Sequence, residues 1–484
     1  MIGTLAFRHL LVKKARSLFL LLGFSIGVGV MIVLLSVGEA MLDQSRDVSL
    51  VGGGELTVLP QGIDVEAMRT GGLGGMFFTI ERARFLTRQA LGGERNRDLI
   101  HTVAPAIEGK LIYLCPAAGQ CRPTAVRAGG EIPSRAAAVG AGLRVLEGRW
   151  ADSPADSAYV APTAQQLYDD LDRFHLPRTR DSTWAEWHYF NLVTGPGEWW
   201  YITFLVGGEV DLHDRGDRWG GGMLVTHRRP DGRYDRYTAE VPAAHVVLDT
   251  ARADQAIGES WVRQRDGEYH LHVAARGERG LARLDLVVRP KPNRWFPPVE
   301  LREGGFLSGY VVPALAATAT GRACVAGGCT EVREAAAYHD HNWGVWRDVT
   351  WEWGAAQGKG LSLLYGGVYG PQDAGSSPFF LTLADSLGVY RVLRFGRIEY
   401  GGSRPVEGLP GVRAPQRFTL LGTWETDTVR LSVQVDHALA SQVTASTHRR
   451  TFLQMRGRFE LSGKVLGDSL HDRGQGFFET YLSR

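Results

Sequence analysis

The sequence is poor in cysteine and has no long run of charge of one sign. Four cysteines occur among 484 residues, and 54 lysines and arginines are interspersed with 52 aspartates and glutamates. The formal net charge is only +2, so nothing marks a nucleic-acid-binding surface. No glycine-rich loop ends in Gly-Lys-Ser or Gly-Lys-Thr, the pattern that holds nucleotide phosphates. Nucleic acid is therefore not an expected partner, and no cofactor is expected.

The composition is that of a globular protein rich in tight turns. Hydrophobic residues make up 44% and charged residues 22%, and there are 61 glycines and 10% aromatic residues. Such a mixture suits many short strands joined by turns. A chain of 484 residues is too long for one ordinary core, so several domains are expected.

One apolar run predicts a membrane span. Residues 18–37 contain no charged side chain, and about 20 such residues cross the hydrocarbon core as a helix. Basic residues precede the run and acidic residues follow it, which places residues 1–17 in the cytoplasm. We expect a transmembrane helix over 18–38 in the inner membrane, with the lipid bilayer as a partner and the main body periplasmic. A cleaved signal peptide is the alternative, but its apolar region would be shorter.

The cysteines fall into two local pairs. Cys115 precedes Cys121, and Cys324 precedes Cys329, each pair bracketing a glycine-bearing turn. In an oxidising compartment each pair could close a loop as a disulfide. Zinc is the rival interpretation, although the spacing of the first pair is wider than that of most zinc ligands. The compartment favours two disulfides.

From Trp184 onward the sequence has the period of two that is typical of half-buried strands. Residues 429–436 alternate apolar and polar side chains throughout. Turn signals such as Asp266-Gly267 separate these runs. About 300 residues of short strands exceed one small barrel, which predicts two barrels or sandwiches in tandem. We assign them to residues 181–330 and 331–484, after a small α+β segment over 39–180.

The stretch from Tyr338 to Trp353 is the best candidate for a site, because ionisable groups and four indoles alternate within it. Ionisable groups among aromatic rings lose hydration and must find partners. A strand would place alternate residues on opposite faces. The expected groups are His339, His341 and Trp343 on one face, and Tyr338, Asp340 and Asn342 on the other.

Four segments, in order, resemble the AttH/CrtC-like family, which includes carotenoid 1,2-hydratase (hydroxyneurosporene synthase). These segments are Glu186-Trp187-His188-Tyr189-Phe190-Asn191 with Glu198-Trp199-Trp200-Tyr201, then Gly309-Tyr310-Val311-Val312-Pro313-Ala314-Leu315, then Tyr338-His339-Asp340-His341-Asn342-Trp343-Gly344, and finally Gly476-Phe477-Phe478-Glu479-Thr480-Tyr481. The resemblance covers residues 181–484. It implies a mainly β fold of two lipocalin-like antiparallel β-barrels around a cavity for an apolar ligand.

The resemblance also implies roles for particular residues. His341 and Trp343 match a catalytic His-x-Trp pair of the hydratases, and Tyr365 stands where a Tyr-x-Asp pair is expected, without its acid. Asp340 could supply the proton that hydration of an alkene requires. The catalytic candidates are thus Asp340, His341, Trp343 and Tyr365. Candidate ligand-binding residues are Glu198, Trp199, Trp200, Tyr338, Trp346, Trp351 and Trp353.

Two functions follow, and a structural alternative stands beside both. The leading hypothesis is a membrane-anchored protein that binds or transfers an isoprenoid or lipid, and the second is a hydratase-like lyase, isomerase or cyclase. Asp340 and His341 could instead have a purely structural role, in which they form hydrogen bonds to buried polar groups across the barrel interface. The same alternative applies to Glu186. A metal site needs three or four ligands, but spacing along a strand brings together only two histidines, such as His339 and His341. No metal is therefore expected.

Residues 1–60 resemble the first helix of MacB/FtsX-type ABC transporter permeases. The similar residues are the segment 5–11, the basic residues 13–16 and the end of the apolar run at Ser36-Val37-Gly38-Glu39, with a further short motif at 146–150. The later helices of that family are absent. The resemblance implies an ABC transporter permease or ATPase as a partner.

Overall fold

The computed structural model describes residues 14–46, 58, 83–84, 86–88, 93–95, 98–114, 124–139, 151–156, 164–177, 180–303, 306–370, 379–406, 409, 411–445 and 448–482. The chain divides into two compact units. One comprises residues 1–83 and 100–160, and the other comprises residues 84–99 and 161–484. Each unit is described by itself.

The first unit contains a long helix, α2 (Lys14–Arg46), a two-stranded hairpin of β1 (Ala106–Leu114) and β2 (Thr124–Glu131), and the short helix α5 (Pro133–Ala138). Among the described residues, no helix combines the length and the apolar character needed to cross a membrane. The transmembrane helix predicted over 18–38 is therefore not confirmed. Cys115, Cys121 and the motif at 146–150 lie outside the described residues.

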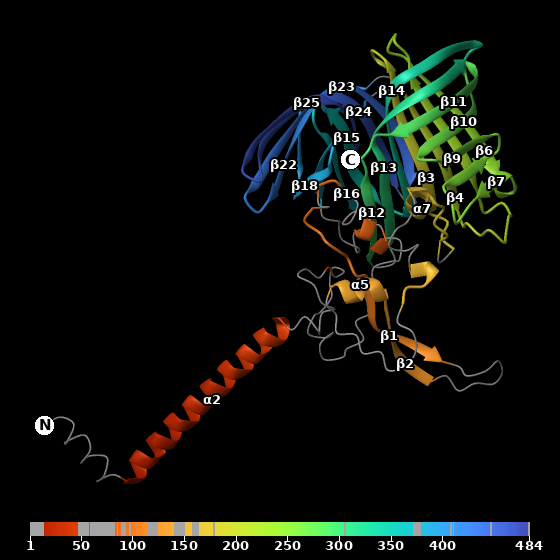
Figure 1. The fold of residues 1–484 in the computed structure, drawn as a ribbon. Coiled ribbons are helices and arrows are strands. Elements are labelled where there is room, and N and C mark those ends of the chain that lie inside the picture. The colour runs from red at the N-terminus through yellow and green to blue at the C-terminus, as the bar shows by residue number, and fades with distance from the viewer. Residues whose placement is uncertain are drawn as a thin grey trace. The chain divides into compact units, whose positions relative to one another are not determined.

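In the second unit, the short helix α7 (Ala164–Asp172) precedes a closed antiparallel barrel. The described strands pair in the ring β3-β4-β5-β6-β10-β11-β13-β14, which β10 and β11 close. This first barrel runs from yellow through green to teal in Figure 1. The bounds are β3 (Trp184–Gly195), β4 (Glu198–Gly208), β5 (Trp219–Arg228), β6 (Tyr234–Pro242), β10 (Glu268–Gly277), β11 (Gly280–Pro290), β13 (Phe306–Val325) and β14 (Gly328–Val345). The strands β7 (Val246–Leu248), β8 (Asp254–Ile257), β9 (Ser260–Arg265) and β12 (Phe296–Glu303) pair at its edges.

A second closed barrel follows, drawn in teal and blue in Figure 1. Its described strands form the ring β15-β16-β17-β18-β22-β23-β24-β25, and β25 returns to pair with β15. The bounds are β15 (Thr350–Gly358), β16 (Ser362–Tyr369), β17 (Phe380–Asp385), β18 (Gly388–Arg394), β22 (Arg417–Trp424), β23 (Asp427–Ala445), β24 (His448–Val465) and β25 (Asp468–Leu482). Short strands β19 (Ile398–Gly401), β20 (Arg404–Pro405) and β21 (Arg413–Ala414) lie beside it.

Local sequence explains these elements. The alternating run predicted at residues 429–436 lies in β23, where the apolar members are buried. Asp266 and Gly267 join β9 to β10 with positive φ angles of 52° and 81°, as the tightest hairpin turns require. The apolar stretch around Pro313 forms β13, whose register shifts between Val311 and Ala314, because proline has no N–H for the ladder.

The longest hairpin of the first barrel is closed covalently. Cys324 on β13 and Cys329 on β14 face each other in the register and form a disulfide. The disulfide predicted for this pair is confirmed. Zinc is excluded as the interpretation of these two cysteines, since both sulfur atoms are bonded to each other.

Three large apolar cores form among the described residues, beside a small cluster of Val349 and Val368. One fills the first barrel, a second fills the second barrel, and a third lies where residues of both barrels meet. The third, which we call the junction core, is rich in aromatic rings: Tyr189, Trp199, Tyr201, Phe296, Tyr310, Tyr338, Trp353, Phe380 and Phe477. The predicted mainly β fold of two tandem antiparallel barrels is confirmed.

Candidate functional site

Strand β14 sends its side chains to two different places, as the period of two predicted. His339, His341 and Trp343 belong to the interior of the first barrel, and Trp343 is among its largest buried side chains. Tyr338 lies in the junction core instead, and Asp340 is hydrogen-bonded to it. The candidate residues therefore form two clusters on opposite faces of one strand.

The interior cluster consists of six buried or half-buried groups: Asp172, His175, Glu186, His188, His339 and His341. A continuous series of close contacts links five of them. His339 Nε2 lies 3.1 Å from Asp172 Oδ2, and Asp172 Oδ1 lies 2.9 Å from His341 Nδ1. His341 Nε2 then lies 2.8 Å from Glu186 Oε1, which is 3.2 Å from His175 Nδ1.

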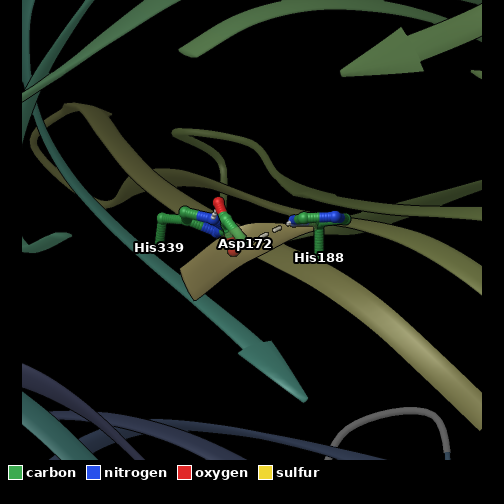
Figure 2. Close-up of side chains that lie close together, drawn as sticks. All are labelled: Asp172, His188 and His339. Atoms are coloured by element: carbon green, nitrogen blue, oxygen red, sulfur yellow. Dashed lines mark hydrogen bonds and ion pairs between the residues drawn. The ribbon is translucent and has the colours of Figure 1, made fainter. Parts of the chain in front are cut away.

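Sheet register and one helix end bring these groups together. His341 on β14 pairs with His188 on β3, and Trp343 pairs with Glu186. Side chains directly opposite in antiparallel strands lie on the same face, and the imidazoles of His188 and His341 stack at 4.0 Å between centroids. Asp172 is the last residue of α7. Figure 2 shows its carboxylate between His339 and His188.

Burial and the opposite charges within the interior cluster set its protonation. Burial opposes ionisation of Asp172, but the surrounding imidazoles outweigh it and hold the pKa of this carboxyl well below its ordinary value. Burial also opposes a charged His341, yet the close contacts and the negative charges of Asp172 and Glu186 raise its pKa to about 9. Burial lowers the pKa of His188 well below its ordinary value. Two carboxylates therefore flank His341 and compensate positive charge at this ring.

The junction cluster, Asp340 and Glu479 with their partners, lies among the rings of the junction core. Tyr338 Oη donates to Asp340 Oδ2 at 2.8 Å, and the Asn342 amide donates to Oδ1 at 2.7 Å. On β25 of the second barrel, Glu479 accepts hydrogen bonds from Trp351 Nε1 at 3.1 Å and from the Gln454 amide at 3.2 Å. Trp353 Nε1 donates to Tyr338 Oη at 3.0 Å. Each barrel thus contributes one carboxyl group.

Both of these carboxyl groups titrate far above their usual range. Burial, reinforced by the charge of Glu479, raises the pKa of Asp340 to about 8. Burial raises the pKa of Glu479 to about 7. The hydrogen-bond partners of both are neutral side chains, which compensate burial of a carboxylate less well than a cation would. At neutral pH Asp340 is therefore held largely as a carboxylic acid, and Glu479 is protonated in about half of the molecules.

The structure separates the four predicted catalytic residues. His341 and Trp343 lie inside the first barrel, where Trp343 Nε1 donates to Glu300 at 3.0 Å and its indole stacks on His175. Asp340 lies in the junction cluster. Tyr365 is fully buried inside the second barrel and stacks on Phe478. No single constellation holds all four among the described residues.

The predicted ligand-binding residues also lie in different parts of the structure. Trp199, Tyr338 and Trp353 lie in the junction core, and Trp351 packs against it. Trp200 instead belongs to the interior of the first barrel and stacks on His227, whose Nε2 contacts Glu198 at 2.9 Å. Trp346 donates to the Ala185 carbonyl and packs beside Trp351. The junction therefore gathers more of these residues than either barrel interior does.

Six groups of these clusters were not among the predicted catalytic and ligand-binding residues: Asp172, His175, Glu186, His188, His339 and Glu479. His188 and Glu479 lie within the family-like motifs. His188 could have been found from the sequence, because it lies two residues after Glu186 and therefore on the same face of the strand. Asp172 and His175 precede residue 181, where the first barrel was expected to begin. No local pattern connects them to residues some 170 positions later in the chain, such as His339 and His341.

A depression of about 500 Å³ on the second barrel contains none of the predicted residues. It is lined by Gly396, Arg397, Glu399, Thr419, Leu420, Leu421 and Arg430. Neither cluster contributes to it. It lacks the aromatic lining expected of an apolar ligand site.

Comparison with known proteins yields similarities among solved structures. No family model matches the chain, and no curated protein matches it. A protein from Nitrosomonas europaea described as AttH is 15% identical with a TM-score of 0.43, covering 64% of this chain and 98% of its own. Kievitone hydratase from Nectria haematococca is 12% identical with a TM-score of 0.44, covering 66% and 93%. CghA with Sch210972 is 11% identical with a TM-score of 0.42, covering 66% and 97%.

AttH is also the name of the family whose motifs the sequence resembles. Kievitone hydratase is by name a hydratase. At these identities and TM-scores the similarities assign no residue role and no activity to this chain. The resemblance of residues 1–60 to ABC transporter permeases is not supported by these comparisons.

Proposed function

We propose that this chain is a lyase that adds water to an apolar alkene at the junction of its two barrels. The observation behind the proposal is the junction cluster. Two buried carboxyl groups, one from each barrel, lie among aromatic rings and have only neutral hydrogen-bond donors as partners. A proton donor in aromatic surroundings is what hydration of an unactivated double bond requires.

The reaction uses Glu479 as the acid. Its carboxyl proton adds to one alkene carbon, and the resulting cation is stabilised by neighbouring π-faces such as those of Tyr338 and Trp353. Water then attacks the cation and returns a proton to the carboxylate, so the net change is the addition of one water molecule. Burial, which raises the pKa of Glu479, favours its protonated form between turnovers.

The substrate class is an isoprenoid alkene. The junction core offers apolar and aromatic side chains together with a few buried polar groups, the usual composition of a site for an apolar small molecule. The family-like motifs of the sequence imply the same class.

Glu479→Gln tests the acid, and Glu352→Gln is its matched control. Glu352 is a half-buried carboxyl of the second barrel whose pKa burial also raises to about 7, but it is hydrogen-bonded to Tyr400 and Thr480 rather than to the junction residues. Purified full-length protein would be incubated with a panel of acyclic isoprenoids in ¹⁸O-labelled water, with product detected by mass spectrometry. We expect labelled alcohol from the wild type and from Glu352→Gln, and none from Glu479→Gln.

The pH profile gives a second readout. Because Glu479 must be protonated, the rate should fall as pH rises through about 7, the pKa to which burial raises this group. A rate that is unchanged in Glu479→Gln would refute the proposal.

Binding without chemistry is the second candidate. The specific observation that favours it is that the oxygens of Asp340 and Glu479 already accept hydrogen bonds, as structural groups do. An isoprenoid or lipid that remains unmodified on the wild type in native mass spectrometry, and is lost from Trp353→Ala, would favour this carrier function. Membrane attachment, an inner-membrane location and an ABC transporter partner rest on residues 1–60 and stay predictions.

A further inference from the structure

The interior cluster of the first barrel contains polar atoms whose contacts do not amount to hydrogen bonds. Asp172 Oδ1, His188 Nδ1 and His341 Nδ1 are fully enclosed and have no hydrogen-bond partner of acceptable geometry, although Asp172 Oδ1 lies 2.9 Å from His341 Nδ1 and 3.7 Å from His188 Nδ1. Buried polar atoms without partners are costly and rare in native proteins. Donor atoms that lie close together without a hydrogen placed between them are arranged as the ligands of a cation are.

We propose that Asp172, His188, His339 and His341 bind one zinc ion that fixes the α7 segment to the first barrel. The donor atoms of Asp172, His188 and His339 lie within 4.8 Å of one another, and Figure 2 shows the carboxylate between the two rings. His341 Nδ1 approaches the same carboxylate from its place opposite His188. Three imidazole nitrogens and one carboxylate are a donor set that zinc prefers.

The spacing of the atoms suits tetrahedral coordination. Zinc binds imidazole nitrogen and carboxylate oxygen at about 2.0–2.1 Å, which separates neighbouring ligand atoms by about 3.3 Å in a tetrahedron. Asp172 Oδ1 lies 2.9 Å from His341 and 3.7 Å from His188, and Asp172 Oδ2 lies 3.1 Å from His339. The rings of His188 and His341 stack at 4.0 Å between centroids, so both must rotate to direct their nitrogens at one ion.

Outer contacts orient the proposed ligands. His339 Nδ1 faces the carbonyl oxygen of Tyr189 at 3.0 Å, and a carbonyl only accepts, so Nε2 is the nitrogen directed at Asp172. His341 Nε2 faces Glu186 Oε1 at 2.8 Å, which directs Nδ1 toward the same place. Metal-binding histidines commonly use their second nitrogen in this way, on a carbonyl or a carboxylate.

Complete burial indicates a structural ion. Asp172, His339 and His341 are each 0% exposed, and four protein ligands leave no position for water or substrate. Because Asp172 ends α7 while the other ligands lie on β3 and β14, the ion would tie residues before the barrel to its interior. This role is independent of the chemistry proposed at the junction.

The experiment measures metal in the full-length protein. Protein unfolded with chelator and refolded with Zn²⁺ or Co²⁺ alone would be desalted, and its metal content determined by elemental mass spectrometry. We expect one ion per chain, a visible absorption spectrum of tetrahedral Co²⁺, and a melting temperature that falls when the ion is removed, since an ion bound only to the folded state stabilises it.

Matched variants locate the ion. Asp172→Asn and His339→Gln should abolish stoichiometric binding, and Glu186→Gln should weaken it by about 10–100-fold, as loss of an outer-shell carboxylate does. Asp285→Asn is the control, because Asp285 forms a His–Asp pair with His272 at 2.6 Å on the exposed face of the same barrel. A refolded wild type that holds no metal would overturn the proposal even if a variant failed to fold. Equal metal content in Asp172→Asn and Asp285→Asn would overturn it too.

Discussion

Glu479→Gln should make the protein's stability less sensitive to pH, and the structure fixes the sign. Burial raises the pKa of Glu479 from 4.5 to about 7, so between these values the folded state holds a proton that the unfolded state has lost. Stability then decreases as pH rises, because the unfolded state binds fewer protons than the folded state. Glutamine has nearly the same shape and cannot ionise.

The magnitude follows from the pKa difference. A shift of about 2.5 units at about 1.4 kcal/mol per unit gives at most about 3.5 kcal/mol of unfolding free energy. Glu479 is only 8% exposed, so little of this is lost to solvent screening. The glutamine keeps an oxygen to accept the Trp351 N–H, and the Gln454 amide can turn to accept from the new amide group. The wild type should therefore lose about 3 kcal/mol relative to the variant, most of it between about pH 5 and pH 7.

Urea unfolding followed by tryptophan fluorescence at several pH values measures this difference. The control is Glu240→Gln, an exposed carboxyl on β6, whose stability should follow the wild type throughout. If the wild type and Glu479→Gln lose the same free energy across this range, Glu479 is not a buried acid of raised pKa. The proposed proton donor would then fail together with the stability argument.

Two further predictions concern the first barrel. Gly309→Ala places a Cβ atom 2.1 Å from Cε2 of Trp343, so we expect overpacking to cost about 1–3 kcal/mol of unfolding free energy and to shift the indole fluorescence. Gly222→Ala on β5 is the control, because the added Cβ would meet nothing closer than 3.9 Å. It should neither cost this unfolding free energy nor shift the indole fluorescence. Replacing Cys324 and Cys329 together by serine opens a short loop and should lower stability by about 2 kcal/mol. Calorimetry that finds the double variant as stable as the wild type would contradict this.

The sequence by itself determined the strands and the faces of β14. Alternation is a local property, so the period of two at residues 429–436 and the opposite directions of His341 and Asp340 could be read before any partner strand was known. The pairing of Cys324 with Cys329 was also local, because only a tight hairpin separates them. The ordered motifs over 181–484 predicted tandem barrels, and the two closed rings confirm that architecture.

Only the tertiary structure decided which groups meet. Closure of the first barrel and docking of α7 bring Asp172 to His339 and His341, and packing of the two barrels brings Asp340 near Glu479. These contacts join positions more than 100 residues apart, and no local period encodes such a distance. Burial, which raises the pKa of Glu479 and strips the interior cluster of water, is likewise a property of the assembled barrels, because it depends on everything packed around a group rather than on its neighbours in the chain.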